Sequence, residues 1–338
     1  MEITTVGVDL AKNVFQVHGM NAHGKTVLRK RLSRGEFLTF FVNLPPCLVA
    51  MEACGSSNYW ARQLLGLGHD ARLISPQFVK PYVKTNKNDF NDAEAICEAA
   101  TRPEMRFVPV KSIEQQDIQA VHRVRQLLVH QRTALVNQAR GLLREYGVFV
   151  AAGIRQFRQA VPGILEDAEN ELTDLSRRLI ADLYTRVLEL DRQVAGYDRE
   201  INQLARQQPI CGRMEKVEGV GVLTATALLA TVGDAKVFKN GRQMSAWLGL
   251  VPRQHSSGER NRLLGISKRG DTYVRSLLVH GARSVLLRCK HKTDRKSRWL
   301  QRLSERRGFN RACVALANKN ARTLWALMAH GDEYRLAT

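Results

Sequence analysis

The 338-residue sequence lacks long apolar runs and paired cysteines, and it has too few acidic residues to balance its basic ones. No stretch approaches the roughly 18 consecutive apolar residues of a membrane-spanning helix, and the chain begins directly with a strand pattern. Its six cysteines are scattered without a Cys-x-x-Cys pair, which excludes a disulfide framework and a zinc site. A soluble, cytoplasmic protein with buried free thiols is therefore expected, with no membrane as a partner.

Acidic residues are scarce above all near the C-terminus. The chain has 52 Lys and Arg against 32 Asp and Glu, a net charge of +20, and residues 251–330 contribute 19 of the basic residues but only 4 of the acidic ones. Fifteen of the twenty excess charges thus lie in that segment. Such asymmetry predicts a polyanionic partner, with nucleic acid the leading candidate, although a solvated basic surface without a specific role is the alternative.

The first third of the chain alternates strand and helix patterns. Apolar alternation and turn residues predict strands at 2–9, 14–19, 26–32, 47–51 and 71–74, and helices after the Ser33–Glu36 capping box, at 58–67 and at 89–101. The predicted fold class is therefore α/β over residues 1–110, followed by a mainly helical remainder.

The middle of the chain reads as two long helices. Apolar residues recur at helical spacing over 113–147 and again over 167–207, which predicts an antiparallel coiled-coil pair at 111–208 that could extend into a dimer or tetramer interface. A mainly α C-terminal domain then spans 209–330. Its Gly219-Val-Gly221 turn resembles the hairpin of helix-hairpin-helix modules, which grip a phosphate backbone; a tight helix-packing turn is the alternative.

Four carboxylates are notable for their positions. Asp9 and Glu52 each end a predicted strand, and Asp89 and Asp92 lie three apart at the start of a helix, on one face. If the strands are neighbours and the helix crosses them, the four acids converge. Oxygen ligands of this kind suit Mg²⁺ or Mn²⁺, and two such ions support phosphoryl transfer. Each acid alone could instead be a helix cap or a surface strand end.

Several motifs carry a family resemblance. They are Val6-Gly-Val-Asp-Leu-Ala-Lys12, Met51-Glu-Ala-Cys-Gly55, Lys87-Asn-Asp-Phe-Asn-Asp92, Trp247-Leu-Gly-Leu-Val-Pro-Arg-Gln-His-Ser-Ser-Gly258 and Ile266-Ser-Lys-Arg-Gly-Asp271. The first three resemble the RuvC-like, ribonuclease-H-fold domain of the DEDD transposases of insertion sequences, which are related to the pilin-gene invertase Piv. The last two resemble that family's C-terminal transposase domain, so the likeness covers nearly the whole chain.

The resemblance implies more than the spacing does. Members of the family are recombinases guided by a bridge or seeker RNA that pairs with donor and target DNA. The resemblance also implies that Asp9, Glu52, Asp89 and Asp92 bind Mg²⁺. It further implies that a serine attacks the scissile phosphate to form a covalent protein–DNA link. The matching serine is Ser257, directly before a glycine, with Ser256 as the alternative. The resemblance also favours active sites shared between subunits, with two dimers forming a tetramer, acting on DNA at the bacterial nucleoid.

Basic side chains surround these serines in the sequence. Guanidinium groups could hold a phosphate and offset charge in the transition state, and His255 could shuttle a proton. The predicted nucleic-acid contacts are Arg253, Arg260, Arg262, Lys268, Arg269 and Arg275. Further backbone contacts are expected over 283–319, where Trp299 and Phe309 could stack on bases. Without the family likeness, a flexible turn is the simplest reading of Ser-Ser-Gly.

Two rival functions remain open at the level of sequence. A RuvC-like nuclease or junction resolvase would cut with metal-activated water, its C-terminal domain serving only to bind. A non-catalytic architectural protein would need no carboxylates, and four clustered acids are unfavourable in a protein that binds anions.

Overall fold

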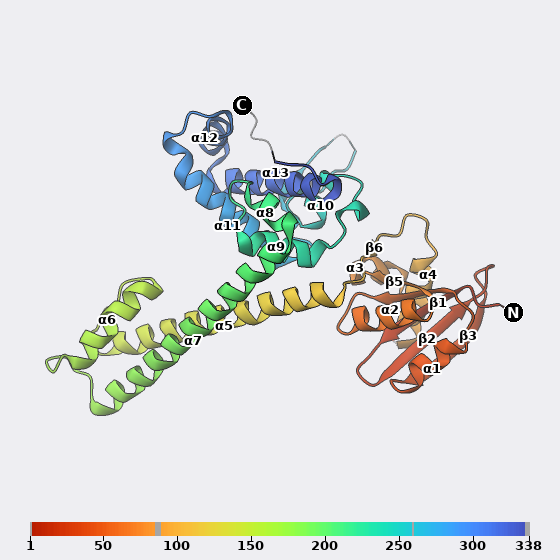
Figure 1. Ribbon diagram of the computed structural model, residues 1–338, viewed down its shortest axis with the longest axis horizontal. Helices are drawn as coiled ribbons and strands as arrows, with labels where there is room; N and C mark the ends of the chain where they lie inside the picture. Colours follow the sequence, from red (N-terminus) through yellow and green to blue (C-terminus); the bar gives the residue numbers. More distant parts are fainter. Residues whose placement is uncertain (1, 85–88, 259, 335–338) are drawn as a thin grey trace. The chain divides into compact units, whose positions relative to one another are not determined.

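The computed structural model describes residues 2–84, 89–258 and 260–334, and the side chain of Asp89 is also outside the description (Figure 1). The chain divides into two compact units, Met1–Ser112 and Ile113–Thr338. The first is a mixed α/β unit and the second is mostly helical, as the sequence predicts. No helix among the described residues is long and apolar enough to cross a membrane.

Unit 1 is a sheet in the order β3-β2-β1-β4-β5-β6. Strands β1, β4 and β5 are parallel, whereas β2, β3 and β6 run antiparallel to their neighbours. The strands are β1 Thr5–Leu10, β2 Val14–Met20, β3 Thr26–Ser33, β4 Leu48–Glu52, β5 Asp70–Ile74 and β6 Phe107–Val108. The sequence predicts five of the six; the two-residue β6 is too short to show a period.

Helices cover both faces of this sheet (Figure 1). They are α1 Glu36–Val42, α2 Ser57–Gly66, α3 Pro76–Val79, the 3₁₀ turn η1 Lys80–Tyr82 and α4 Asp89–Ala100. Phe37 of α1 and Trp60 of α2 pack on Phe15 of β2, with ring centroids 4.9 and 5.2 Å from it. On the opposite face Ile96 of α4 packs on Ala50 of β4. Apolar residues on both faces explain why the central strands read as continuous apolar runs.

The contact between α4 and β1 depends on Gly7. A Cβ built there would lie 2.3 Å from the carbonyl oxygen of Ala93 and 2.5 Å from the backbone nitrogen of Cys97. Only glycine therefore lets the helix backbone approach the strand this closely. Adjacent Val6 and Val8 point to the other face and are fully buried.

Unit 2 begins with a long helix pair, α5 Ile113–Glu145 and α7 Asp174–Gln207, that lie side by side (Figure 1). The second helix starts at residue 174 rather than at 167, because the Thr173 hydroxyl accepts a hydrogen bond from the Ser176 amide and caps the helix. A separate helix, α6 Ile154–Glu166, precedes it and was not predicted. Phe157 of α6 is fully buried against the pair.

A helical bundle with one small hairpin completes unit 2. Its elements are α8 Pro209–Glu215, α9 Val222–Val232, η2 Ala235–Val237, α10 Gly241–Trp247, β7 Pro252–Gln254, β8 Leu263–Ile266, α11 Thr272–Arg288, η3 Cys289–His291, α12 Arg295–Arg307 and α13 Phe309–His330. One apolar core joins α8 to α13. All six cysteines are free thiols; Cys54 is exposed and corrects the expectation that every thiol is buried.

Replacing Gly7 with alanine is expected to destabilise unit 1 by about 1–3 kcal/mol, because the added methyl overpacks the β1–α4 contact. Hydrogen exchange of the β1 and α4 amides in the full-length protein measures this loss locally. Gly35→Ala is the matched control, since no atom lies within 4 Å of a Cβ there and its φ of −72° suits any residue. Equal protection in both variants would contradict the role given to Gly7.

Candidate active site and nucleic-acid interface

Asp9 and Glu52 lie next to each other on neighbouring strands. The parallel register pairs Val8 with Met51, so the two acids occupy the following position on β1 and β4. Because side chains alternate along a strand, Asp9 lies on the face of Gly7, which α4 covers. Glu52 lies on the same face by the same rule, two residues after Ala50. Both side chains are half-buried.

The carboxylates of Asp9 and Glu52 both affect the pKa of the Cys54 thiol. Although the residue is exposed, partial desolvation of its thiol is the largest cause that raises its pKa, and the negative charges of Glu52 and Asp9 raise the pKa further. Both charges therefore act on one position just beyond β4. The two strand ends thus form a local region of negative potential at the carboxyl edge of the sheet.

Helix α4 brings Asp92 to the same face. Asp92 is half-buried and directly precedes Ala93, whose carbonyl oxygen meets Gly7. Asp89 begins the helix, but its side chain lies outside the described residues. Among the side chains that are described, no three His, Cys, Asp or Glu residues form a group able to hold a metal ion. The four-carboxylate site therefore stays a prediction.

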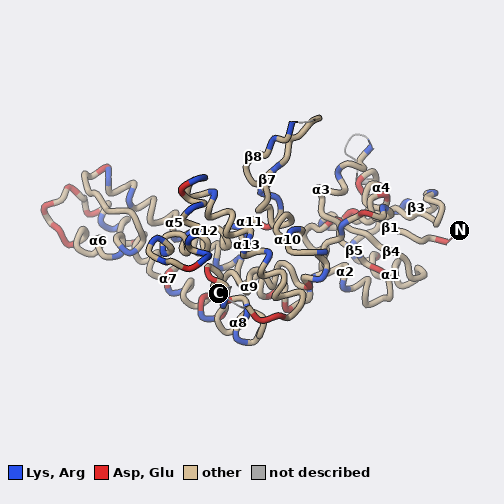
Figure 2. The backbone as a smooth tube through the Cα atoms, turned by 90° about the horizontal axis from the view of Figure 1, so that it is seen from above, with Lys and Arg blue, Asp and Glu red and all other residues tan. Residues whose placement is uncertain are grey.

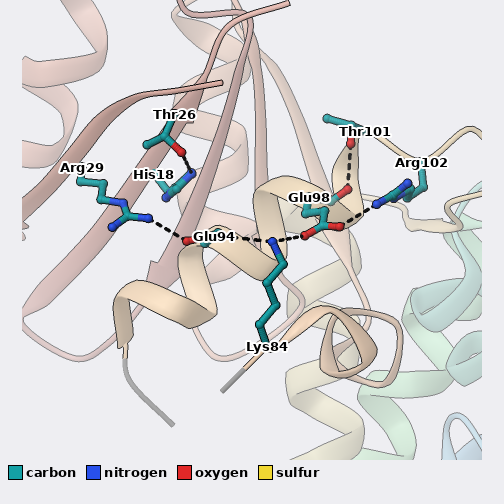
Figure 3. Close-up of polar contacts among 8 residues, drawn as sticks. All are labelled: His18, Thr26, Arg29, Lys84, Glu94, Glu98, Thr101 and Arg102. Atoms are coloured by element: carbon teal, nitrogen blue, oxygen red, sulfur yellow. Dashed lines mark hydrogen bonds and ion pairs between the residues drawn. The ribbon is translucent and has the colours of Figure 1, made fainter. Parts of the chain in front are cut away.

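A network of ion pairs fixes the outer side of α4 (Figure 3). Lys84 Nζ lies 3.0 Å from Glu98 Oε2 and 3.4 Å from Glu94 Oε1. Arg29 on β3 binds Glu94 at 2.9 Å, and Arg102 binds Glu98 at 2.6 Å. The Lys84 ammonium is the main reason that the pKa of Glu98 is lowered. These contacts tie the chain segment before α4, and strand β3, to the helix that carries Asp92.

The two candidate serines lie on the β7–β8 hairpin, which projects from the rest of unit 2 (Figure 2). Ser256 Oγ accepts hydrogen bonds from Gln254 Nε2 at 3.0 Å and from the Arg262 amide at 3.3 Å. The Ser257 hydroxyl makes no hydrogen bond within the described part of the hairpin, although its carbonyl accepts one from the Arg260 amide. Gly258 follows in the left-handed region, with φ of 57°. Ser256 thus helps to hold the hairpin together, whereas the Ser257 hydroxyl stays exposed.

The predicted nucleic-acid contacts divide into two groups. Arg253, Arg260, Arg262, Lys268 and Arg269 are all exposed on the hairpin or at its base. Arg275 on α11 is only 8% exposed, and its guanidinium donates to backbone carbonyls. Burial and these bonds make Arg275 a poor candidate for a phosphate contact, so the structure does not support this prediction.

Helix α12 carries a stripe of arginines on its exposed side. The spacing of three and four residues places them on one helical face: Arg295, Arg298, Arg302 and Arg306. None of the four forms an ion pair with any residue that the structure describes. Each of the two predicted stacking rings makes a cation–π contact within the protein. Lys319 Nζ lies 5.1 Å from the centre of the Trp299 ring, and the Arg283 guanidinium lies 5.9 Å from that of the Phe309 ring.

The arginines of the α5–α7 pair behave differently. Arg125 Nε lies 2.6 Å from Asp198, and Arg132 Nη1 lies 2.6 Å from Asp191. Helix α7 thus neutralises two of the α5 arginines, whereas Arg123 and Arg144 are exposed. The hairpin and α12 each carry several further exposed arginines.

The Gly219-Val-Gly221 turn packs closely on α11. A Cβ on Gly219 would lie 2.9 Å from the carbonyl oxygen of Gly281, and one on Gly281 would lie 1.8 Å from the carbonyl oxygen of Gly219. Helix α9 begins directly after the turn, with Gly221 as its cap. Gly219 therefore serves a helix-packing contact, the alternative that the sequence left open, whereas no atom lies within 4 Å of a Cβ built on Gly221.

Comparison with known proteins agrees with this architecture. Residues 211–298 match the family described as "Transposase IS116/IS110/IS902 family", and residues 6–148 match a DEDD domain of IS110 elements described as "Transposase". A "Probable family 20 transposase" of Pseudomonas aeruginosa is 53% identical over 99% of both chains. The "Transposase for insertion sequence element IS1111A" of Coxiella burnetii is 50% identical, covering 99% of this chain and 92% of the relative.

A third relative also matches nearly the whole chain. The "Transposase for insertion sequence element IS1328" of Yersinia enterocolitica is 41% identical over 98% of both chains. Both family matches and these full-length relatives support one assignment. The carboxylate pair of unit 1 and the basic surface of unit 2 agree with it. The chain belongs to the IS116/IS110/IS902 family of insertion-sequence transposases, and so is a DNA recombination enzyme.

Proposed function

We propose that this transposase is guided by an RNA and that it cuts and rejoins donor and target DNA through a covalent phosphoserine intermediate. The observation that carries the proposal is the pairing of Asp9 and Glu52 on adjacent parallel strands, with α4 and Asp92 packed on the same face. The exposed serine hairpin supplies the second part of the chemistry.

The sheet order of unit 1 supports a ribonuclease-H-like, RuvC-like domain. Three antiparallel strands followed by two parallel ones, with the acids at β1, β4 and the helix after β5, match the arrangement that the motifs resemble. We propose domains at 1–110, 111–208 and 209–330: a DEDD catalytic domain, a coiled-coil linker for oligomerisation and a transposase domain with a helix-hairpin-helix-like turn.

The donor set fits a hard divalent cation. Asp9, Glu52, Asp89 and Asp92 offer only carboxylate oxygens, which suit Mg²⁺ and, less strictly, Mn²⁺. When bound, such a cation supplies electrostatic stabilisation of the charge that builds on a phosphate. The Gly7 contact supports this role, since it holds α4 against the strand that bears Asp9, and the Lys84 ion pairs join the segment before α4 to that helix.

The serine step conserves the energy of the broken bond. The Ser257 oxygen forms a bond to phosphorus, the bond from phosphorus to one DNA oxygen breaks, and the serine proton leaves to a base while the departing oxygen gains one. A DNA hydroxyl then attacks the phosphoserine and releases the serine. Because the ester keeps the bond energy, rejoining needs no nucleotide hydrolysis. Arg260 and Arg262 lie close along the hairpin to hold the phosphate.

Ser257 is the preferred nucleophile because its hydroxyl is exposed and makes no hydrogen bond among the described residues. The hydroxyl of Ser256 accepts two hydrogen bonds that brace the hairpin. An attacking oxygen must have its lone pairs available, and Ser256 would have to give up those bonds first.

Guide RNA and DNA are proposed to bind the arginines of the hairpin and of α12. Exposed guanidiniums without carboxylate partners suit phosphate contacts, which carry no base specificity. If an RNA reads the DNA by pairing, the protein needs only such contacts. Exposed Leu127, Leu175 and Leu179 on the long helices support assembly into dimers and then tetramers.

One rival enzyme and one rival binder remain to be tested. A RuvC-like nuclease or junction resolvase would use the same carboxylates but would not need Ser257. An architectural protein would need neither. The following variants separate these functions from the proposed one.

Substituting Asp9 or Asp92 with asparagine is expected to weaken Mn²⁺ binding at least about ten-fold, because each removes a charged ligand. Titration of the full-length protein with Mn²⁺, followed by electron paramagnetic resonance, measures the free ion directly. Asp70→Asn is the matched control, since Asp70 is an exposed acid on β5 paired with Arg72. Unchanged Mn²⁺ affinity in both site variants would exclude a metal role for these acids.

Ser257→Ala is expected to lower formation of the covalent protein–DNA adduct by at least about 10³-fold, the effect of removing a nucleophile. Denaturing gels with labelled DNA detect the adduct. Ser256→Ala, which loses two hydrogen bonds but not the proposed nucleophile, is expected to retain it within about ten-fold. The reverse result would make Ser256 the nucleophile. Cutting without an adduct in the wild-type protein would favour the nuclease.

RNA guidance predicts that one discrete, structured RNA copurifies with the full-length protein when nucleases are omitted. Extraction and sequencing identify it, and it should map beside the gene. Combined substitution of Arg298 and Arg302 by glutamine should lower its recovery, whereas Arg186→Gln on the α5–α7 pair should not. Heterogeneous fragments, or none, would contradict a tightly held guide.

A further inference from the structure

We propose that the buried Arg275 is a positioning residue that fixes the direction of the β7–β8 hairpin and so aims the serine hydroxyl at the DNA. This inference rests on the proposed function for its chemical consequence. Its structural part, the control of the hairpin by one guanidinium, can be measured without any reaction.

The hairpin has almost no packing of its own. Every residue of β7 is exposed, and on β8 only Ile266 is half-buried. Leu263 is 66% exposed, although it is apolar. A two-stranded ribbon of this size is marginal by itself. Its direction must therefore be set where it joins the helical bundle.

Backbone segments at the base of the hairpin are in very close contact. Gly249 and Gly270 both have φ of 74°, in the left-handed region. A Cβ on Gly249 would lie 2.3 Å from the carbonyl oxygen of Arg269, and one on Gly270 would lie 2.0 Å from that of Trp247. The entering and leaving strands are thus pressed together at a point that admits no side chain.

Arg275 joins the two sides of this base. Its Nη1 donates to the carbonyl oxygen of Leu248 at 3.1 Å, before β7, and to that of Arg269 at 2.8 Å, after β8. Its Nη2 donates to Thr272 Oγ1 at 3.0 Å. The side chain comes from α11, whose first turn is capped by the Asp271 carboxylate. One guanidinium therefore links both ends of the hairpin to the first turn of α11.

A lysine does not reproduce this contact. The guanidinium offers several donors in one plane, whereas an ammonium is a single point on a flexible stem. Both carbonyls accept from Nη1 and Thr272 Oγ1 accepts from Nη2. A lysine side chain is one atom shorter and has a single nitrogen, so Arg275→Lys loses at least one of these three bonds while the charge remains. The base can then hinge, and the serine at the far end of the hairpin moves by more than the base does. Misplacement of a reacting group by about 1 Å costs about 10²-fold in rate.

Spin labels on the full-length protein test the clamp directly. Labels at Leu264→Cys on the hairpin and Glu305→Cys on α12, in a Cys54→Ser background, report one distance within unit 2. Pulsed electron paramagnetic resonance should give a narrow distribution for the parent and a distribution at least twice as wide for Arg275→Lys. Arg288→Lys, an exposed arginine on the same helix, should leave the width unchanged. Equal widths in all three proteins would overturn the proposal.

Kinetics test the chemical consequence. Arg275→Lys should lower the rate of adduct formation at saturating DNA by about ten-fold or more, with DNA affinity changed less than two-fold. A wide distance distribution with an unchanged rate would also overturn the proposal. If Arg275→Lys does not fold, Thr272→Val removes only one acceptor and is expected to show the same effects at smaller size. Retention of the adduct in Ser257→Ala would refute the proposed nucleophile and leave the distance measurement to decide the clamp separately.

Discussion

The approach of helix α4 to strand β1 at Gly7 is the constraint on which the acidic site depends. With any side chain at this position, the helix would have to move outward, because a Cβ would meet the Ala93 carbonyl at 2.3 Å. The contact places Asp92 on the sheet face that Asp9 and Glu52 share. Lys84 and its two glutamates secure the same helix from outside. Backbone packing, rather than attraction between side chains, therefore sets where these acids lie.

A second close contact governs the serines in unit 2. The hairpin that carries Ser256 and Ser257 gains its direction from two glycines and one buried arginine at its base. The acids of unit 1 and the serines of unit 2 are thus both positioned by close backbone contacts that only glycine permits. Exposed segments carry the reactive groups, while buried backbone determines where they point.

The arginines of unit 2 differ in whether a carboxylate pairs with them, and the net charge of the chain does not show this difference. Arg125 and Arg132 of α5 are neutralised by Asp198 and Asp191 of α7. Arginines of α12 and of the hairpin meet no such partners among the described residues. The second group is therefore available to phosphates. The excess of basic residues near the C-terminus corresponds to an exposed surface, whereas two arginines of the first long helix serve helix packing.

Local sequence determined most elements of unit 1 and both long helices of unit 2. Alternation, caps and heptads predicted five strands and the two long helices, although the second begins at Asp174 rather than at 167, and the motifs identified the family. Glycine within the first strand was itself a signal of close backbone approach. The sequence could not decide that Asp9 and Glu52 follow the Val8–Met51 pair, because register depends on which strands become neighbours. Nor could it tell a buried arginine from an exposed one, since Arg275 and its neighbours look alike until tertiary packing gives one of them backbone carbonyls to bind.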